Sequence, residues 1–488
     1  MQQSSPQLTL KEVITAAGAT LISGGRDAVF RGICTDSRLL ISGNLFVALR
    51  GDNFDGHDFA QKALDLGAAG VVISDAGKID LKETGNAAVI KVADTLSALG
   101  DFAHYWRSKF SVPVFGLTGS SGKTTTKEMM AAIIGRQKNI LKTEGNLNNL
   151  IGLPQTIFRL SSAHEAAILE MGTNAPGEIK RLTQIAAPDF GLITNIGPAH
   201  LAKLGSIEGV RREKGDLFAY MDKNGTAVVN LDDENIRIIS DAWKGRRVTF
   251  SMISDADVRL AKMEKSGARG MILKLVVASK EYKAEMKIAG THNVYNALAA
   301  AAAALALDID VENILAGLAA FTPVAGRMQV TKLKNGAYLI DDSYNANPAS
   351  MREALMTLKD MKSGHAGYAF LGDMLELGDA AAEMHRKIGM LAAVTGVNTL
   401  FLQGEFSQVT AAGAAEGGLP DDKIIFLSDP ERAALNLKKI LKKGDWILVK
   451  GSRRMKMEKI SGRICEDFGC DRAGAGRQET KGEGVKKQ

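Results

Sequence analysis

One stretch of this chain, residues 112–126, restricts the possible folds more than any other. It reads V-P-V-F-G-L-T-G-S-S-G-K-T-T-T, an apolar run followed by a glycine-rich turn and a segment suited to a helix. A strand, a glycine-rich turn and a helix start form a phosphate-binding loop, whose backbone N–H groups point at phosphate oxygens. Lys123 brings a positive charge to the phosphates, and the hydroxyl of Thr124 can bind Mg²⁺. The sequence therefore predicts a nucleoside triphosphate site.

This loop departs from the common pattern G-x-x-x-x-G-K-[ST], because Leu117 occupies the place of the first glycine. The alternative is a glycine- and threonine-rich turn that binds nothing, and the apolar run before the turn favours the phosphate loop. The predicted nucleotide contacts from this loop are Thr118, Gly119, Ser120, Ser121, Gly122, Lys123, Thr124 and Thr125.

Length and composition restrict the class of protein. At 488 residues the chain is too long for one core, and about 150 residues per domain suggests three domains. The net charge of +6 is small and its lysines and arginines are spread along the chain, which argues against a nucleic-acid partner. The longest apolar run, residues 297–307, is shorter than the roughly 20 residues of a membrane span. We expect a soluble, cytoplasmic protein, because the first residues do not resemble a signal peptide.

The three cysteines are Cys34, Cys465 and Cys470. Their spacing makes no paired metal site and no disulfide framework, which fits a reducing compartment. We therefore expect no disulfide bond.

Short apolar segments alternate with helix-like segments along almost the whole chain, and this predicts an α/β fold. We expect a small N-terminal α/β domain over residues 1–110, with proline in S-V-P at 111–113 marking its end. A central P-loop NTPase-like domain with a mainly parallel sheet is expected over 111–325. A Rossmann-like doubly wound domain is expected over 326–470, and residues 471–488 are polar enough to be a disordered tail.

Polar residues follow several predicted strands, where ligands collect in parallel sheets. Glu170 ends the apolar strand 166–170, at a place suited to a second Mg²⁺ ligand, and Asn195 and His200 follow the strand 189–196. Similar clusters stand at 35–38, 51–57, 341–348, 372–378 and 451–454. For the clusters at 35–38 and 51–57 the alternative is ordinary turn chemistry, because Asp, Asn, Ser and Gly all favour turns. For Glu170 and His200 the alternative is a solvent-exposed side chain.

Four stretches over three domains resemble the Mur ligase family, the ATP-dependent amide-forming enzymes of peptidoglycan synthesis. The resemblance extends from Thr35 to about Glu458 and is greatest to the branch that adds D-alanyl-D-alanine. The stretches are E-G-N-L-N-N-L-I-G-L-P at 144–154, D-S-Y-N-A-N-P at 342–348, L-G-D-M-L-E-L-G at 371–378 and V-K-G-S-R at 449–453.

The resemblance implies roles for individual residues. Lys123 would bind the phosphates, Thr124 and Glu170 one Mg²⁺, and His200 a second. Lys214 matches the family's carbamoylated lysine, whose carbamate reaches the metal site. The implied catalytic residues are Lys123, Lys214, His200 and Arg327. Asn293 would contact adenine, and Arg327 and Asp342 the γ-phosphate and ribose. The implied substrate contacts are Ser37, Arg38, Asp55 and His57 for the UDP-sugar, Asn146 and Asn149 for the peptidyl part, and Asn345 and Asn347 for the incoming dipeptide.

The implied reaction joins D-alanyl-D-alanine to UDP-N-acetylmuramoyl-tripeptide, with ATP as cosubstrate, through an acyl phosphate. We expect the enzyme to be a monomer. Its expected cofactor is Mg²⁺, bound as two ions. The third peptide residue, lysine or diaminopimelate, stays open. Alternatives are another Mur-type ligase that adds the third residue, a folylpolyglutamate-like ligase, or a P-loop ATPase that is not a ligase. One departure from the family is Ala202, which stands where an acid two residues after His200 is expected.

Overall fold

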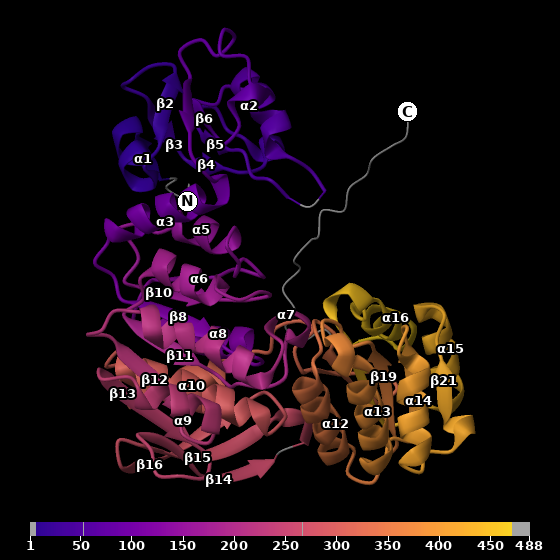
Figure 1. Ribbon diagram of the computed structural model, residues 1–488. Helices are drawn as coiled ribbons and strands as arrows, with labels where there is room; N and C mark the ends of the chain where they lie inside the picture. Colours follow the sequence, from indigo (N-terminus) through magenta and orange to yellow (C-terminus); the bar gives the residue numbers. More distant parts are fainter. Residues whose placement is uncertain (1–5, 52, 266, 471–488) are drawn as a thin grey trace. The chain divides into compact units, whose positions relative to one another are not determined.

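The computed structural model describes residues 6–51, 53–265 and 267–470, so the tail predicted at 471–488 lies outside the described residues. Contacts between residues divide the chain into two compact units. The first contains the residues up to Lys287, Thr291–Thr322 and the short segment Glu376–Asp379. The second contains Ile288–Gly290, Pro323–Leu375 and the residues from Ala380 on. Figure 1 shows the elements of both units.

A five-stranded sheet lies at the start of the first unit. Its strand order is β2-β7-β6-β5-β4, and all neighbours are parallel except β2 and β7. Strands β1 and β3, from the same part of the chain, form a separate two-stranded antiparallel sheet. The strands are β1 Gln7–Thr9, β2 Thr20–Ser23, β3 Val29–Arg31, β4 Ile33–Cys34, β5 Leu45–Val47, β6 Gly70–Ile73 and β7 Ala88–Lys91. The helices are α1 Leu10–Ala17, α2 Ala60–Asp65, and the 3-10 helices η1 Ser37–Leu39, η2 Gly56–Phe59 and η3 Ala76–Lys78.

Helix α3, Thr95–Ser108, connects this sheet to the central part of the chain. It begins where the Asp94 side chain accepts a hydrogen bond from the Ser97 N–H, a standard N-cap. Its apolar spacing buries Leu99 and Phe102 in a single core cluster that also includes residues of β5 and of the central sheet. The N-terminal and central parts therefore share one hydrophobic core.

The central sheet has nine strands in the order β16-β15-β14-β13-β12-β11-β8-β10-β9. From β9 to β14 all neighbours are parallel, as the βα alternation predicts. The strands are β8 Val114–Thr118, β9 Ile140–Lys142, β10 Ala166–Glu170, β11 Phe190–Ile193, β12 Thr226–Asn230, β13 Arg246–Ser251, β14 Val258–Lys265, β15 Met271–Val277 and β16 Lys280–Met286. The sequence analysis missed the antiparallel extension β14-β15-β16.

Two groups of helices belong to the central sheet. Helices α4, α10 and α11 contact one another, and α8 contacts both α6 and α9. Alanine side chains fill most of the buried surface of α10, and their small size allows close approach to α4. The helices are α4 Lys123–Ile134, α5 Gly152–Ile157, α6 Glu178–Ala186, α7 Leu201–Leu204, α8 Ile207–Tyr220, α9 Glu234–Asp241, η4 Gly267–Arg269, α10 His292–Ala306 and α11 Val311–Ala320.

The second unit is built on a six-stranded sheet in the order β17-β18-β22-β19-β20-β21, parallel except for β17. Figure 1 shows α12, α13 and α14 side by side, in agreement with the contacts among them. The strands are β17 Gln329–Lys332, β18 Tyr338–Asp342, β19 Gly367–Gly372, β20 Thr399–Gln403, β21 Ile424–Phe426 and β22 Trp446–Lys450. The helices are α12 Pro348–Lys362, η5 Gly378–Ala380, α13 Ala381–Val394, α14 Ser407–Glu416, η6 Asp421–Lys423, α15 Pro430–Ile440, η7 Arg453–Met455 and α16 Glu458–Phe468.

The expectation of no disulfide bond is wrong, because Cys465 and Cys470 are joined. Helix α16 ends at Phe468, and Gly469 turns the chain with a positive φ of 68°. This turn brings Cys470 back beside Cys465, with 5.0 Å between the Cα atoms. Cys34 is a free, half-buried thiol.

A polar contact between α1 and α3 gives a test of this arrangement. Glu12 accepts hydrogen bonds from Lys109 Nζ at 2.5 Å and from the hydroxyl of Tyr105 at 3.2 Å. Burial alone would raise the pKa of the Glu12 carboxyl, but hydrogen bonds from Lys109 and Thr9 outweigh it and lower the pKa to about 2.

We predict that Glu12→Gln weakens the fold in a pH-dependent way. The folded pKa lies below the ordinary value, so the ionised carboxylate stabilises the fold above about pH 4.5, and this contribution is lost as the pH falls toward 2. The substitution should lower the free energy of unfolding by about 1 kcal/mol near neutral pH, and by progressively less in acid. Urea unfolding over a series of pH values measures this, and an equal loss at every pH would contradict it.

Candidate active site

The phosphate loop connects β8 to α4, and two of its glycines are required by close neighbours. A Cβ on Gly119, whose φ is 150°, would lie 1.9 Å from Thr194 Oγ1. A Cβ on Gly122, whose φ is 77°, would lie 2.3 Å from Asn296 Oδ1. No side chain caps the first turn of α4, which begins at Lys123. The first N–H groups of a helix lie outside its own hydrogen-bond ladder and suit an anion.

The residues after β11 clamp this loop in place. Asn195 Oδ1 accepts the Ser121 N–H at 3.0 Å, and Asn195 Nδ2 donates to the Ser121 carbonyl at 3.2 Å. The hydroxyl of Thr194 donates to the same carbonyl at 2.6 Å. The hydroxyl of Ser120 donates to the Gly197 carbonyl at 2.9 Å. Hydrogen bonds from the residues that follow β11 therefore fix the conformation of the phosphate loop.

The predicted loop contacts divide into two kinds. Lys123 Nζ lies over the loop and donates to the Gly119 carbonyl at 2.7 Å, at the place where phosphates would be bound. Thr118 is fully buried and its hydroxyl donates to the Met171 carbonyl at 2.9 Å, so this side chain supports the loop. The side chain of Thr125 is buried as well.

Glu170 and Thr124 meet as the sequence analysis expects. Thr124 Oγ1 donates to Glu170 Oε1 at 3.3 Å. The second oxygen, Glu170 Oε2, is buried and has no hydrogen-bond partner among the described residues, and Lys127 Nζ lies 3.8 Å from it. A hydroxyl next to a carboxylate with a free oxygen is a donor set that suits Mg²⁺. The residues present therefore fit this cation.

Two neighbours of Glu170 were missed by the sequence analysis. Asn148 Nδ2 donates to Glu170 Oε1 at 3.0 Å. Lys127 is buried, donates to the Thr143 carbonyl at 2.6 Å and pairs with Glu128 at 3.1 Å. Asn148 could have been predicted, because it lies in the same asparagine-rich motif as the predicted contacts Asn146 and Asn149. No sequence pattern pointed to Lys127.

The remaining asparagines of this motif have different surroundings. Asn149 is exposed, and its side-chain oxygen accepts the N–H groups of Ile151 and Gly152 at 3.1 and 2.8 Å. Asn146 is exposed. The contacts of both to a peptidyl substrate stay predictions.

His200 stands before α7 in the left-handed region, with φ 54°. Its Nδ1 lies 2.6 Å from Glu376 Oε2, in the short segment that groups with the first unit. In the described part of the chain no three His, Cys, Asp or Glu side chains gather that could hold a metal ion. Glu170 and His200 are thus not joined by a third such ligand.

Lys214 lies on α8 and is fully buried. Burial, and then the positive charge of Lys123, lower the pKa of its amine well below the ordinary value, while the neighbouring Glu213 opposes the shift. The neutral amine is therefore favoured. Glu213 itself accepts the N–H groups of Gly177 and Ile179 at 2.6 and 2.8 Å, which attaches α8 to the start of α6.

Asn293 lies in the first turn of α10 and is buried. Its Oδ1 accepts Asn296 Nδ2 at 2.8 Å. Asn296 Oδ1 in turn accepts the Thr126 hydroxyl at 3.2 Å, so α10 is tied to the phosphate-loop helix. Asn296 was missed by the sequence analysis.

The N-terminal predicted contacts form two separate turns. Arg38 donates to Asp36 at 2.6 Å, which lowers the pKa of that carboxyl to about 2, and Ser37 is half-buried between them. In the second turn His57 is buried, its Nδ1 lies 2.6 Å from Asp55, and its Nε2 accepts the Ser74 N–H at 2.9 Å.

Both ring nitrogens of His57 are bonded within the protein, so its ring supports the turn. The contact of His57 with a ligand stays a prediction. The backbone N–H and the ring of His57, together with Arg50, lower the pKa of the Asp55 carboxyl to about 2, although burial opposes the shift. Asp55 and Arg38 keep exposed surface.

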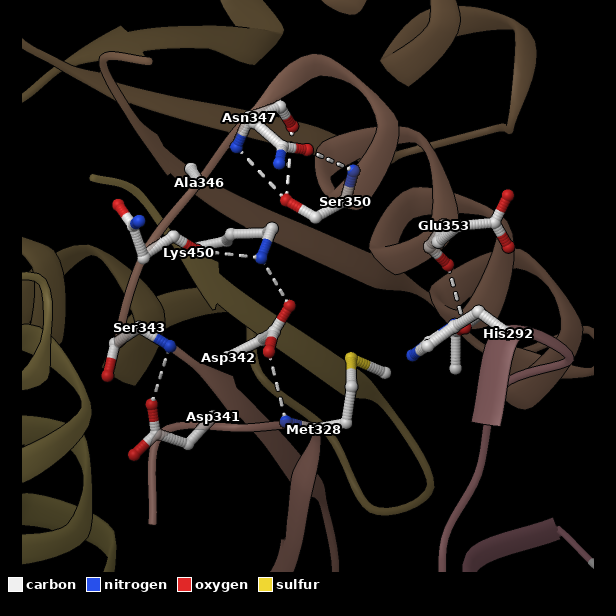
Figure 2. Close-up of polar contacts among 12 residues, drawn as sticks. His292, Met328, Asp341, Asp342, Ser343, Ala346, Asn347, Ser350, Glu353 and Lys450 are labelled. Carbon is white, nitrogen blue, oxygen red and sulfur yellow. Dashed lines mark hydrogen bonds and ion pairs between the residues drawn. The ribbon is translucent and has the colours of Figure 1, made fainter. Parts of the chain in front are cut away.

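In the second unit Asp342 ends β18, Lys450 ends β22 and Asn347 stands before α12, and Figure 2 shows all three. Asp342 accepts Lys450 Nζ at 2.5 Å and the Met328 N–H at 3.1 Å. Lys450, which is buried and was missed by the sequence analysis, also donates to the Asn345 carbonyl at 3.0 Å. The guanidinium of Arg327 lies 4.1 Å from the centre of the Tyr344 ring.

Both asparagines predicted to face the dipeptide are hydrogen-bonded within the second unit. Asn345 Oδ1 accepts the Arg453 N–H at 3.2 Å. Asn347 caps α12 and shares a reciprocal pair of hydrogen bonds with Ser350, as Figure 2 shows. Their contact with a dipeptide stays a prediction.

Comparison with known proteins decides the family. Three family models match successive stretches: "Mur ligase family, catalytic domain" at 29–107, "Mur ligase middle domain" at 117–304 and "Mur ligase, glutamate ligase domain" at 326–453. The UDP-N-acetylmuramoyl-tripeptide--D-alanyl-D-alanine ligase of Bacillus subtilis is 34% identical over 453 residues, covering 93% of this chain and 97% of that protein. The chain belongs to the Mur ligase family.

Solved structures of Mur ligases agree with this. MurF from Acinetobacter baumannii matches with a TM-score of 0.85 and 31% identity, covering 95% of this chain and all of that one. MurF from Thermotoga maritima, in complex with ADP, matches with a TM-score of 0.79 and 27% identity, covering 89% and 97%. The predicted fold class, an α/β chain with three Mur ligase domains, is confirmed. In the described residues no helix has the length and apolar character needed to cross a membrane.

We predict that Gly122→Ala damages the nucleotide site of this Mur ligase. The added Cβ would meet Asn296 Oδ1, and the backbone conformation is strained for any residue with a side chain. The affinity for ADP should fall by at least about tenfold. Gly462→Ala is the matched control, because a Cβ there meets nothing within 4 Å. Titration calorimetry with ADP tests this, and unchanged affinity in the Gly122 variant would contradict it.

Proposed function

We propose that this chain is an ATP-dependent ligase that joins D-alanyl-D-alanine to UDP-N-acetylmuramoyl-tripeptide. The product is the UDP-N-acetylmuramoyl-pentapeptide precursor of peptidoglycan. The observation that carries this proposal is the match over 93% of the chain to ligases of that specificity. The clamped phosphate loop and the adjoining Thr124–Glu170 pair support this proposal, because their geometry suits ATP and Mg²⁺.

The reaction requires ATP because a carboxylate oxygen is a poor leaving group. A terminal carboxylate oxygen of the tripeptide attacks the γ-phosphorus of ATP, the bond to ADP breaks, and an acyl phosphate forms. The amine of D-alanyl-D-alanine then attacks the carbonyl carbon and loses a proton, and phosphate leaves with the carboxylate oxygen. No side chain has to act as a nucleophile, so positioning and charge neutralisation provide the catalysis.

Lys123 is the residue we assign to the β- and γ-phosphates, because its ammonium already lies over the loop. Mg²⁺ at Thr124 and Glu170, when bound, neutralises phosphate charge. His200 keeps Nε2 available as a further ligand, since Glu376 lies at Nδ1. We assign Asn293 to the adenine, and Arg327 and Asp342 to the γ-phosphate and ribose.

The predicted domains then correspond to the three substrates. Residues 1–110 bind the UDP-sugar, with Ser37, Arg38 and Asp55 as contacts. Residues 111–325 bind ATP, and residues 326–470 bind the dipeptide. We propose that the enzyme is a cytoplasmic monomer.

Lys214 is assigned the carbamate role. Only a neutral amine attacks CO₂, and the burial of Lys214 beside Lys123 favours that form. The N–C bond forms, one proton leaves the nitrogen, and the product is an anionic carbamate that can compensate the charge of nearby cations.

We predict that Lys214→Ala lowers kcat by at least about 100-fold. Lys223→Ala, which removes an exposed lysine of the same region, should have no effect. Carbon NMR after equilibration with ¹³C-bicarbonate should show a carbamate signal in the wild type and in the Lys223 variant only. A carbamate signal that persists in the Lys214 variant would contradict the assignment.

The function is tested by phosphate release from ATP. We predict release only when UDP-N-acetylmuramoyl-tripeptide and D-alanyl-D-alanine are both present, and loss of release in Lys123→Ala. Replacing the dipeptide by lysine, diaminopimelate or glutamate separates the other Mur-type and folylpolyglutamate-like ligases. Release that depends on neither substrate would favour the P-loop ATPase and overturn the proposal.

A further inference from the structure

One short segment, residues 144–157, contacts two distant parts of the first unit. Near its start, Asn148 Nδ2 donates to Glu170 Oε1 at 3.0 Å. The Asn148 carbonyl accepts the Gly172 N–H at 2.7 Å, and a Cβ on Gly172 would lie 2.9 Å from Asn148 Oδ1. This end of the segment is therefore fitted closely against the strand end that carries Glu170.

The other end of the segment contacts the N-terminal sheet. Gln155, on α5, donates from Nε2 to Thr35 Oγ1 at 3.1 Å, across 120 positions of sequence. Thr35 follows β4 and begins the turn that carries Asp36, Ser37 and Arg38. Because the Thr35 oxygen accepts this bond, its hydroxyl hydrogen is left to donate elsewhere.

The surroundings of α5 hold Gln155 in place. Leu153 and Ile157 of the same helix are buried in the core cluster shared by the N-terminal and central parts. Phe158, directly after the helix, belongs to this cluster too. Just beyond it, the Leu160 carbonyl accepts Trp106 Nε1 of α3 at 3.1 Å. Since α5 cannot shift easily, the amide of Gln155 fixes the position of Thr35.

The geometry points to Gln155 as a positioning residue for the nucleotide-sugar substrate. It sets the Thr35–Arg38 turn at a defined distance from the phosphate loop, and Thr35 presents a hydroxyl donor to that substrate. The inference rests on the proposed function, because it assumes that this turn binds the UDP-sugar. Thr35 belongs to the predicted polar cluster 35–38, but Gln155 was not predicted, and no local pattern in the sequence connects the two residues.

The test uses four variants of the full chain. Gln155→Leu removes the donor at similar size, Thr35→Val removes the hydroxyl, and a double variant combines them. Thr35→Ser keeps the hydroxyl. We expect the KM for UDP-N-acetylmuramoyl-tripeptide to rise about five- to tenfold in both single variants, with the KM for ATP within about twofold of the wild type. The double variant should be no worse than Thr35→Val, and Thr35→Ser should match the wild type.

Gln137→Leu is the matched control. Its amide bonds to Asp310 on the surface, away from the Thr35 turn, and its KM values should not change. Additive losses in the double variant, or equal rises in both KM values, would show a general structural role and overturn the inference.

Titration calorimetry with UDP-N-acetylmuramoyl-tripeptide separates this inference from the proposed function. If the wild type fails to bind it, the proposed function fails and the inference with it. If the wild type binds and Gln155→Leu binds equally well, only the inference fails.

Discussion

The backbone of the phosphate loop runs so close to its neighbours that side chains at Gly119 and Gly122 would collide with Thr194 and Asn296. Those neighbours come from different elements, the end of β11 and helix α10, so the loop, the sheet and the Ala-rich helix have to fit together at once. Thr194 and Asn195 then hold Ser121 by four hydrogen bonds. In the proposed function, a loop held in this way would bind the phosphates without reorganising, which is how preorganised donors contribute to catalysis.

Three buried lysines of this chain differ in the charged groups that surround them. Lys127 lies among the Thr143 carbonyl, Glu128 and Glu170, and so its positive charge compensates the carboxylates beside the phosphate loop. Lys450 does the same for Asp342 in the second unit. Lys214 differs, because its charged neighbours include Lys123 and burial favours its neutral form. A buried amine whose charged form is disfavoured is suited to react, whereas one whose charge is balanced by carboxylates has a structural role.

The sequence predicted what depends on local pattern, and missed what depends on packing. The strand–turn–helix of the phosphate loop and the βα alternation follow from apolar spacing and glycine positions, and both are present. Among the asparagines in residues 146–149, only the path of the backbone decides that Asn148 reaches Glu170. The burial of Lys127 and Lys450 and the pairing of Cys465 with Cys470 likewise arise from contacts between elements. His57 lies in a polar turn predicted to bind a ligand, yet both nitrogens of its ring are bonded within the protein.

In the proposed mechanism, ATP held by the phosphate loop activates a carboxylate by transferring its γ-phosphoryl group to it. The most direct measurement uses UDP-N-acetylmuramoyl-tripeptide labelled with ¹⁸O in its terminal carboxylate, with ATP and D-alanyl-D-alanine. The acyl-phosphate route predicts that each phosphate released carries one oxygen from that carboxylate, which mass spectrometry detects. Phosphate released without the label would mean that water attacks ATP, and it would contradict the acyl-phosphate route.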